Sequence, residues 1–300
     1  PWKNFGYNRT EALQLAVSKD LPTADYLLFI DADEQLQAAE DFVLPALTAK
    51  AYYFPVIYGA LRYRRNAMIS TTLEWSWKGV IHEYLHSQQL HRWQTLEGLN
   101  IFVQHDGARA KNKNTYLNDI ALLEQGLIDE PDNLRYVFYL AQSYRDAGMF
   151  EKAREYFLKR AVAVGWEEER WMAQFRAAQM AERLGLDEVI IHREYLKSWI
   201  SNQSRAEPLY ALARYYRLKK DFDLACYFAM QAIDIPSPKD GLFVDASIYE
   251  WRALDELAVS ATYCKIYKKQ GQEAMQKLLT EKKYPKTQQV RMLANEKFYK

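Results

Sequence analysis

The pattern of hydrophobic and polar residues predicts alternating strands and helices over the first third of the chain. Residues 8–18 place apolar side chains at the spacing of an amphipathic helix. Short apolar runs rich in aromatic and β-branched residues predict strands at 26–30 (YLLFI), 52–57 (YYFPVI) and 101–104 (IFVQ). We therefore expect a mixed α/β domain over residues 1–115.

From about Tyr116 onward the strand signals disappear, and amphipathic helices with short breaks follow one another. Within residues 134–165, Ala141, Gly148 and Ala153 occur at the spacings of a tetratricopeptide (TPR) repeat. The small alanines let two antiparallel helices approach closely, and Gly148 makes the turn between them. We expect residues 116–300 to form an all-α, TPR-like helical domain.

The same pattern returns further along the chain. It is matched about 72 residues later by Leu209, Ala213, Tyr216 and Ala225. The segment FRAAQMAERLG at 175–185 is a middle copy, so two periods of about 36 residues fit between the outer copies. Three helix pairs would bury a continuous core that no single pair could bury alone. A generic helical bundle with chance matches stays open as the alternative.

Two carboxylates, Asp31 and Asp33, follow the apolar run at 26–30. Strand side chains alternate between faces, so residues two apart point the same way. In an open α/β sheet, ligands bind beyond the carboxyl ends of the strands, and two oxygen ligands there suit Mg²⁺ or Mn²⁺. The alternative is a turn that ends the strand and caps the next element.

Two other interpretations of the acidic pair fit poorly. A calcium-binding EF-hand loop needs Gly at its sixth position and Glu at its twelfth, where this chain has Leu36 and Phe42. A phosphatase or other hydrolase with Asp31 as nucleophile would have Thr or Val where Gln35 stands. A hydrolase stays open only as a departure from this sequence pattern.

Downstream, EWSWKGVIHEYL at 74–85 combines Trp75, Trp77, His82 and Glu83. Tryptophan faces stack on sugar rings, and the His–Glu pair offers a proton acceptor. The alternative is a tryptophan pair in the core with solvated polar neighbours.

The segment QHDGARAKNK at 104–113 adds a histidine and several cations. A neutral imidazole at His105 is a candidate third metal ligand, and cations such as Arg109 could hold a diphosphate. The alternative is that His105 is only a surface residue in a turn.

Composition narrows these possibilities only a little. The 40 Lys+Arg and 39 Asp+Glu leave a formal net charge of +1, so global charge favours neither nucleic acid nor an anionic membrane as partner. No window approaches the roughly 18 apolar residues of a membrane-spanning helix. We expect no transmembrane segment and a cytoplasmic location. Cys226 and Cys264 fit neither a metal pattern nor a secreted disulfide framework, which predicts buried thiols in a reducing compartment.

Taken together, these motifs resemble a family 2 glycosyltransferase of GT-A fold with a C-terminal TPR-like domain. The resemblance rests on YLLFIDADEQL (26–36), WKGVIHEYL (77–85), HDGAR (105–109) and NDIALLEQGLIDEPDNLRYVFYLAQSYRDAG (118–148). It implies a truncated GT-A catalytic domain, a Rossmann-like mixed sheet, at 1–115, followed by the helical repeats at 116–300. Because only 30 residues precede Asp31, it also implies that the first strands are missing from this chain.

The resemblance further implies an inverting, metal-dependent transfer of a sugar from a nucleotide-sugar, with a UDP-sugar expected, to a glycan, lipid-linked or protein acceptor. Mn²⁺ or Mg²⁺ would be the cofactor. The implied roles are donor binding for Asp31, Arg9 and Arg109, metal binding for Asp33, Asp31 and His105, proton abstraction for Glu83 or His82, and sugar stacking for Trp75 and Trp77.

A second function from a different class stays open. The chain could be a non-catalytic TPR adaptor built on a decayed transferase remnant, because TPR surfaces bind peptides. In either case the TPR-like domain is the expected site for a peptide partner or for a second copy in a homodimer.

Overall fold

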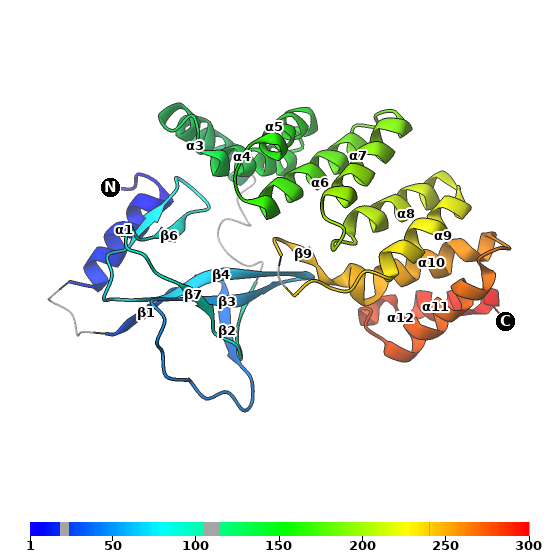
Figure 1. Ribbon diagram of the computed structural model, residues 1–300, viewed down its shortest axis with the longest axis horizontal. Coiled ribbons are helices and arrows are strands. Elements are labelled where there is room, and N and C mark those ends of the chain that lie inside the picture. Colours follow the sequence, from blue (N-terminus) through cyan, green and yellow to red (C-terminus); the bar gives the residue numbers. More distant parts are fainter. Residues whose placement is uncertain (19–23, 105–113, 240, 300) are drawn as a thin grey trace. The chain divides into compact units, whose positions relative to one another are not determined.

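The structure is a computed structural model that describes residues 1–18, 24–104, 114–239 and 241–299. The chain divides into two compact units, Pro1–Gly165 and Trp166–Lys300. The first unit holds a sheet with helices, and the second is built mainly from helices (Figure 1). This agrees with the predicted succession of a mixed α/β part and a helical part.

The sheet of the first unit is mixed and largely antiparallel. Its strands follow the order β1-β4-β3-β8-β2, with β7 paired to β3. The β3–β8 and β3–β7 pairings are parallel. The strands of this unit are β1 (Tyr26–Leu28), β2 (Glu34–Ala38), β3 (Ala51–Tyr58), β4 (Leu61–Ser70), β5 (Ser76–Lys78), β6 (Tyr84–His86), β7 (Trp93–Thr95) and β8 (Leu99–Val103).

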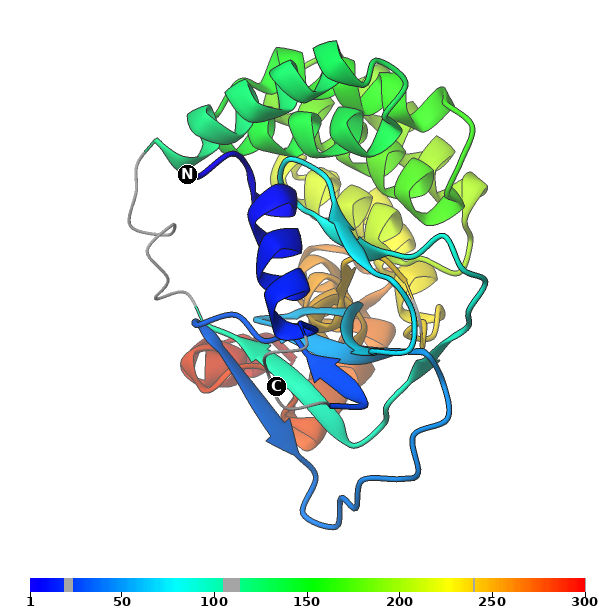
Figure 2. The ribbon, with the colours of Figure 1, turned by 90° about the vertical axis from the view of Figure 1, so that its left-hand side faces the viewer.

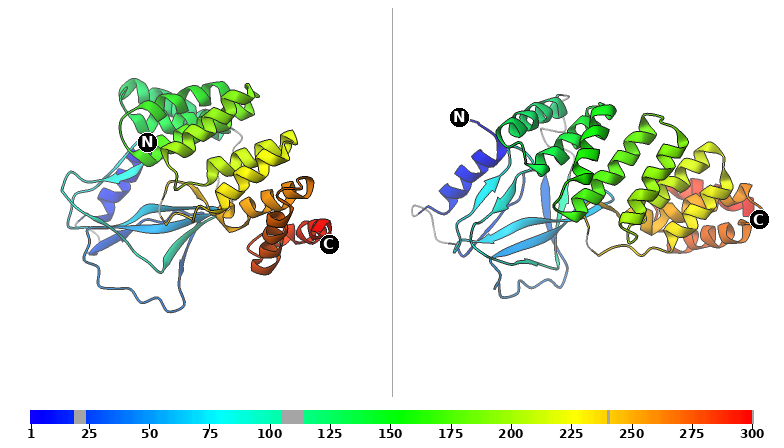
Figure 3. Two further views of the ribbon diagram at one scale, coloured as in Figure 1. Left: turned by 45° about the vertical axis from the view of Figure 1, so that its right-hand side comes forward. Right: turned by 45° about the horizontal axis from the view of Figure 1, so that its top comes forward.

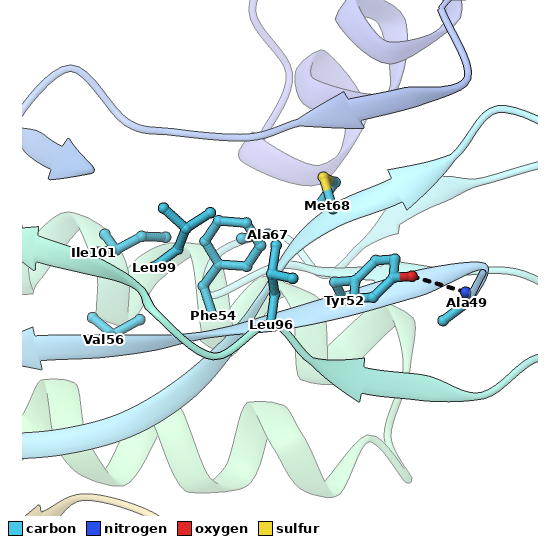
Figure 4. Close-up of a cluster of buried hydrophobic side chains, with 9 residues drawn as sticks. All are labelled: Ala49, Tyr52, Phe54, Val56, Ala67, Met68, Leu96, Leu99 and Ile101. Atoms are coloured by element: carbon cyan, nitrogen blue, oxygen red, sulfur yellow. Dashed lines mark hydrogen bonds between the residues drawn. The ribbon is translucent and has the colours of Figure 1, made fainter. Parts of the chain in front are cut away.

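The core of this sheet lies along β3, which is buried on both sides at its start. Phe54, Val56 and Ile101 are almost fully buried in one cluster, where the Tyr52 hydroxyl accepts a hydrogen bond of 2.9 Å from the backbone N–H of Ala49 (Figure 4). Gly59, with φ +58°, makes the tight turn from β3 to β4. The apolar runs predicted as strands at 52–57 and 101–104 therefore form the sheet's centre.

Helix α1 (Phe5–Ala16) packs beside the β5–β6 hairpin, as Figure 2 shows in dark blue and cyan. Its first turn is capped by the Asn4 side chain, which accepts from the Tyr7 backbone N–H at 2.8 Å. The backbone N–H of Gly6 donates to the Gly79 carbonyl at 3.2 Å, and Thr10 exchanges hydrogen bonds with the Trp77 backbone. The helix start is thereby locked to the segment that carries the WKGVIHE motif.

Among the described residues, the first unit also contains the helices α3 (Thr115–Asp129), α4 (Leu134–Asp146) and α5 (Phe150–Val162). Helix α4 reaches the WKGVIHE segment, because the Val80 backbone N–H donates to the Tyr136 hydroxyl at 3.2 Å. Arg135 donates to the His82 carbonyl at 2.8 and 3.0 Å. These contacts explain why the compact unit extends beyond α3. The predicted boundary at residue 115 coincides with the change from strands to helices. The division into domains at that residue stays a prediction.

The second unit consists of helices packed against their neighbours in the chain. In Figure 3, α6 to α9 run alternately up and down, coloured from green to yellow. The elements are α6 (Glu167–Arg183), α7 (Glu188–Ser201), α8 (Glu207–Lys219), α9 (Phe222–Ile233), β9 (Val244–Asp245), the π-helix η1 (Ile248–Arg252), α10 (Ala253–Ser260), α11 (Lys268–Glu281), α12 (Gln289–Glu296) and the short 3₁₀ turns η2 (Ala261–Tyr263), η3 (Lys286–Gln288) and η4 (Lys297–Tyr299).

One turn geometry recurs in three helix pairs. Gly148, Gly185 and Lys220 all have positive φ, at +78°, +63° and +64°, and each follows the first helix of its pair. Each residue donates its N–H to the carbonyl three positions back, at 3.0 Å in all three turns. The next N–H in each turn reaches the carbonyl five positions back, which is the Schellman pattern. The predicted repeat of helix pairs, spaced by about 36 residues, is confirmed at this level.

Buried alanines support the same repeat. They allow the close helix approach that the sequence predicted. Residues with no exposed surface include Ala141 and Ala153 in the first pair, Ala177 and Ala181 in the second, and Ala213 and Ala225 in the third.

Replacing Lys220 by Gly should stabilise the second unit. A left-handed backbone is unfavourable for a residue with a Cβ, and glycine adopts it freely, so we expect a gain of about 0.5–1 kcal/mol in the free energy of unfolding. Urea unfolding followed by circular dichroism measures it. The converse change, Gly185→Lys, has open space for a side chain and should cost a similar amount. A loss of stability on Lys220→Gly would contradict this account.

Candidate functional site

Five ionised side chains that lie far apart in the sequence meet in the first unit, and we call them the charged cluster: Arg9, Asp31, Glu34, Arg65 and Glu83. Arg9 lies on α1 and forms ion pairs with both Asp31 and Glu83, the latter at 2.7 Å. The Glu83 side chain is only 9% exposed. Three predicted site residues are thus brought together by the fold.

The second half of the charged cluster was not predicted. Arg65 of β4 makes a bidentate ion pair with Glu34 of β2, with hydrogen bonds of 2.5 and 2.6 Å. Its Nη1 also lies 3.5 Å from Oδ2 of Asp31. Burial would lower the pKa of the Arg65 guanidinium, but Glu34 and Asp31 raise it. Arg65 therefore stays charged.

The turn between β1 and β2 shapes this arrangement. The Glu34 backbone N–H donates to the Asp31 carbonyl at 3.0 Å, and the Asp31 backbone N–H donates to the Glu34 carboxylate at 2.9 Å. Burial alone would raise the pKa of Glu34. The hydrogen bonds from Arg65 and from the Asp31 backbone outweigh burial and lower the pKa below its ordinary value of 4.5.

This lowered pKa predicts a loss of stability in acid. A carboxylate with a folded-state pKa below its unfolded value contributes stability above the unfolded value and loses it as pH falls through the folded value. Wild type should therefore lose free energy of unfolding from roughly pH 5 downward more steeply than Glu34→Gln, which cannot titrate there. Urea unfolding at successive pH values measures the difference. Parallel pH profiles for the two proteins would contradict it.

His82 occupies a different place from Glu83, although they are adjacent in the sequence. Its backbone is left-handed, with φ +52°, and its ring stacks on Tyr139 with centroids 3.9 Å apart. Arg135 lies over the rings of Tyr84 and Tyr139, at 5.1 and 4.8 Å. The His82 ring therefore belongs to an aromatic and cationic group on α4, while Glu83 belongs to the charged cluster.

The two tryptophans of the predicted sugar-stacking pair pack against other side chains of the first unit. Trp77 is 9% exposed, packs edge-on against Phe29 and lies under Arg9, whose guanidinium carbon is 4.6 Å from the ring. Trp75 donates its indole N–H to the Ser70 carbonyl at 2.9 Å and contacts Trp93. Both positions agree with the core alternative.

A shallow pocket of about 170 Å³ opens next to Trp77. Arg9 is the charged residue among those that line it. The other lining residues are Ala12, Leu13 and Ala16 of α1, Leu27, Leu28 and Phe29 at β1, and Trp77. An apolar lining of this kind suits a hydrophobic side chain better than a phosphate.

The predicted metal site is not assembled from the residues that the structure describes. Among them, no three His, Cys, Asp or Glu side chains are grouped so as to hold a metal ion. The Asp33 carbonyl accepts a hydrogen bond of 2.9 Å from the Gln104 backbone N–H. His105 and Arg109 lie outside the described residues. Mn²⁺ or Mg²⁺ as cofactor, and the individual roles assigned to the site residues, stay predictions.

The charged cluster is suited to holding structure together. Its two guanidinium groups connect α1, the β1–β2 turn, β4 and the segment at Glu83 through three carboxylates. Asp31 faces two cations, and this neutralisation weakens it as a ligand for a divalent ion. Arg65 escaped prediction because it belongs to no motif. Glu34 lies within YLLFIDADEQL but was given no role, because the sequence does not show that the fold places Arg65 of β4 beside it.

The second unit carries a row of ion pairs that link α6 to α8, α8 to α10 and α10 to α12, which we call the arginine ladder: Arg214–Glu182, Arg217–Glu256 and Arg291–Asp255. The Arg291 pair is bidentate, with both distances 2.9 Å. Glu182 also accepts from the Tyr195 hydroxyl at 2.6 Å. Burial and the Glu182 carboxylate raise the pKa of Tyr195 well above its ordinary value, so its hydroxyl keeps its proton and donates.

Comparison with known proteins was made by sequence and by structure. No family model matches the chain, and no curated protein matches it. Among solved structures, a crystal structure of MamA is similar with 18% identity and a TM-score of 0.45 over 59% of this chain and 98% of that one. A second MamA crystal structure has 17% identity and a TM-score of 0.43, covering 57% and 85% of the two chains.

MamA residues 41 to the end, from Desulfovibrio magneticus RS-1, is similar with 12% identity and a TM-score of 0.41, covering 58% of this chain and 87% of that one. With TM-scores below 0.5, the function must be argued from the residues of this chain.

The predicted family is wrong, and so is the predicted enzyme class. The three solved structures described above are MamA proteins, and neither a family model nor a curated protein supports a glycosyltransferase. The physical reason lies in the sheet. The prediction placed Asp31 and Asp33 beyond an open α/β sheet, but β1 and β2 each pair antiparallel with a neighbour. Arg9 and Arg65 neutralise Asp31, and the expected nucleotide-sugar donor loses its support.

Two further expectations can be compared with the structure. Cys226 and Cys264 are buried free thiols, as predicted, and burial raises the pKa of the Cys226 thiol to about 12. Among the described helices, none combines the length and the apolar character needed to cross a membrane.

Proposed function

We propose that this protein is a non-catalytic adaptor whose TPR-like helices bind a segment of another protein. The recurrence of one helix-pair turn at Gly148, Gly185 and Lys220 carries the proposal. Stacked helix pairs of this kind present extended surfaces on which peptides bind. The charged cluster fits the same function, because it stabilises the first unit without exposing a metal site among the described residues.

The arginine ladder is the surface we assign to the partner. Arg214 and Arg217 lie on α8, the first helix of its pair, and their side chains are 32% and 30% exposed. Arg252, in η1, is 34% exposed and lies over the ring of Tyr210 at 4.6 Å. A guanidinium binds a carboxylate through two parallel hydrogen bonds. A carboxylate of the partner would therefore displace the chain's own carboxylate from the guanidinium, or bind the same guanidinium beside it.

The chemistry points to an acidic peptide rather than to a basic one. Arg214, Arg217 and Arg252 each already contact a carboxylate, so the surface is preorganised for that group. The aromatic ring of Tyr210 beneath Arg252 holds the guanidinium in place by a cation–π contact. An extended peptide with Asp or Glu at several positions would match this spacing of cations.

Fluorescence anisotropy with the whole chain tests the function. Labelled peptides of equal length would be compared, one group rich in Asp and Glu, one neutral and one rich in Lys. We expect the acidic peptides to bind with affinities in the micromolar range and to weaken as salt is raised, because exposed ion pairs are screened.

Variants show whether the arginine ladder and Arg252 form the surface that binds the peptide. Arg217→Ala and Arg252→Ala should each weaken acidic peptides by about tenfold, since a charge-assisted hydrogen bond contributes about 1.5 kcal/mol or more. Arg193→Ala, an exposed arginine on α7, is the matched control and should leave binding unchanged. Thermal unfolding of each variant separates a lost contact from a lost fold. If none of the peptides binds more tightly than about 1 mM, the adaptor function is contradicted.

A further inference from the structure

The charge of this chain is concentrated at its C-terminal end. Residues 265–300 contain nine lysines and one arginine against three glutamates, although the whole chain has a formal net charge of only +1. Arg291 is held by Asp255 in the arginine ladder. The lysines from 265 to 297 are all exposed, for example Lys269 at 86% and Lys277 at 53%. A local positive field of this size attracts anionic surfaces within about a Debye length.

The last helix also exposes apolar side chains. Helix α12 buries Met292 completely, while Val290 is 81% and Leu293 48% exposed. Val290, Leu293 and Ala294 are spaced three and four apart, so they share one helical face. These apolar side chains are exposed to solvent, so they are available for contact with a partner.

The residues after α12 add an exposed aromatic side chain to this end of the chain. Tyr299 is anchored, because its hydroxyl donates to the Ala258 carbonyl at 2.5 Å. Its neighbour Phe298 is 66% exposed. Four exposed lysines lie near α12 in the chain: Lys282, Lys283 and Lys286 precede it, and Lys297 follows it. Lys283 has one partner, Glu281, at 2.9 Å.

We propose that the C-terminal end of this chain, formed by α12 with Phe298 and the four lysines around it, docks onto an anionic lipid bilayer surface. The apolar side chains Val290, Leu293 and Phe298 would enter the headgroup region. Lysines beside an apolar helix face are the pattern of a helix that lies in a membrane interface. Each lysine near an anionic leaflet strengthens binding, and several together bind stably when apolar contacts are added.

Other occupants fit the surface less well. A second copy of this chain would place two lysine-rich faces against each other, and like charges repel. Protein interfaces are depleted in lysine and enriched in arginine, tyrosine and tryptophan, whereas the exposed cations here are lysines. Nucleic acid would leave Val290 and Leu293 without an apolar environment. Arg291 of the arginine ladder lies on α12, but Arg217 and Arg252, which the peptide test replaces, lie on α8 and η1, so this proposal stands apart from peptide binding.

Vesicle flotation with the whole chain tests the proposal. One set of vesicles is pure phosphatidylcholine, and in the other about a third of the lipid is phosphatidylserine. We expect binding to the anionic vesicles only, and loss of that binding as salt is raised. Two variants address the two parts of the surface. Replacing the four lysines by Gln should weaken binding by about tenfold or more, and Val290→Gln with Leu293→Gln and Phe298→Gln should weaken it comparably.

Matched controls make the result specific. Gln replacements of Lys78, Lys152, Lys197 and Lys219, four exposed lysines elsewhere, change the net charge equally and should leave vesicle binding unchanged. Val189→Gln removes an apolar side chain that is 70% exposed on α7 and should also have no effect. Circular dichroism melting confirms that every variant folds. The proposal is overturned by equal binding to both vesicle types, by no binding to either, or by equal losses in the two lysine variants. It is also overturned if the chain dimerises through α12 or binds DNA while ignoring the vesicles.

Discussion

Arg205→Ala should destabilise the second unit more than any other single change considered. Arg205 is 1% exposed and donates to Glu207 from Nε at 3.1 Å and from Nη2 at 2.7 Å. The Glu207 side chain is itself only 3% exposed. Removing the guanidinium leaves a buried carboxylate without its counter-charge, which costs about 3–5 kcal/mol of the free energy of unfolding. Urea unfolding followed by helical circular dichroism measures this loss.

The reason for so large an effect is that Arg205 connects several elements at once. It also donates to Glu168 of α6 at 3.2 Å and to the Leu242 carbonyl at 3.2 Å. Its guanidinium carbon lies 4.1 Å from the ring of Trp171. The Tyr249 hydroxyl donates to Glu207 at 2.6 Å and would be the main remaining partner of that carboxylate. One hydrogen bond cannot replace a buried bidentate ion pair.

A paired variant tests the charge argument separately from packing. Arg205→Met with Glu207→Gln removes both charges and should recover most of the stability that Arg205→Ala loses, because neither member of this buried pair is left ionised without its partner. The exposed pair Arg170–Glu167 is the comparison, and Arg170→Ala should cost less than about 1 kcal/mol. If Arg205→Ala and Arg170→Ala had equal effects, burial would not be the cause.

Gly6→Ala should detach α1 from the first unit. An added Cβ would lie 2.3 Å from the backbone oxygen of Gly79, far inside van der Waals contact. Alanine favours the helix by up to about 1 kcal/mol over glycine. The steric conflict opposes this gain and is larger, because its partner is backbone atoms rather than a flexible side chain. We expect a net loss of about 2–3 kcal/mol, measured by urea unfolding with tryptophan fluorescence.

The segment at Gly79 has little freedom to move away. Gly79 itself has φ +108°, and Arg135 and Tyr136 of α4 hold the following residues. Gly59→Ala is the matched control, since it has a positive φ but open space around the position of the Cβ. Gly59→Ala should lower the free energy of unfolding by only about 1 kcal/mol, the cost of a left-handed backbone for a residue with a Cβ. A Gly6→Ala protein as stable as wild type would show that α1 does not pack as described.

The fold was predictable wherever local sequence determines structure. The apolar runs at 52–57 and 101–104 became β3 and β8, and the run at 26–30 became the shorter strand β1. The longest strand, β4, was not predicted, because its first half alternates arginines with Tyr63 and Leu61 and resembles a polar connection. Pairing with β3 stabilises it, and that pairing depends on residues outside the strand.

The candidate site was predictable only in part. Arg9, Asp31 and Glu83 were chosen from three separate motifs, and the fold does bring them together. Arg65 lies in no motif and Glu34 was given no role, so the local pattern could not show that both Arg9 and Arg65 face Asp31. The motif order suggested a metal site, which stays a prediction, and the described contacts of Arg9, Asp31 and Glu83 form an ion-pair network.

The repeat of helix pairs was determined by the sequence alone. Two local features produce this repeat: a residue that adopts the left-handed turn, and alanines where the helices cross. Both act over a few residues, so they recur in the sequence at a regular spacing. The function of charged residues was decided only by the tertiary structure. A carboxylate can be a ligand, a base or half of an ion pair, and the choice depends on which cation the fold places beside it. Arg9 and Arg65 reach Asp31 from α1 and β4, and no pattern within LLFIDADE reports either neighbour.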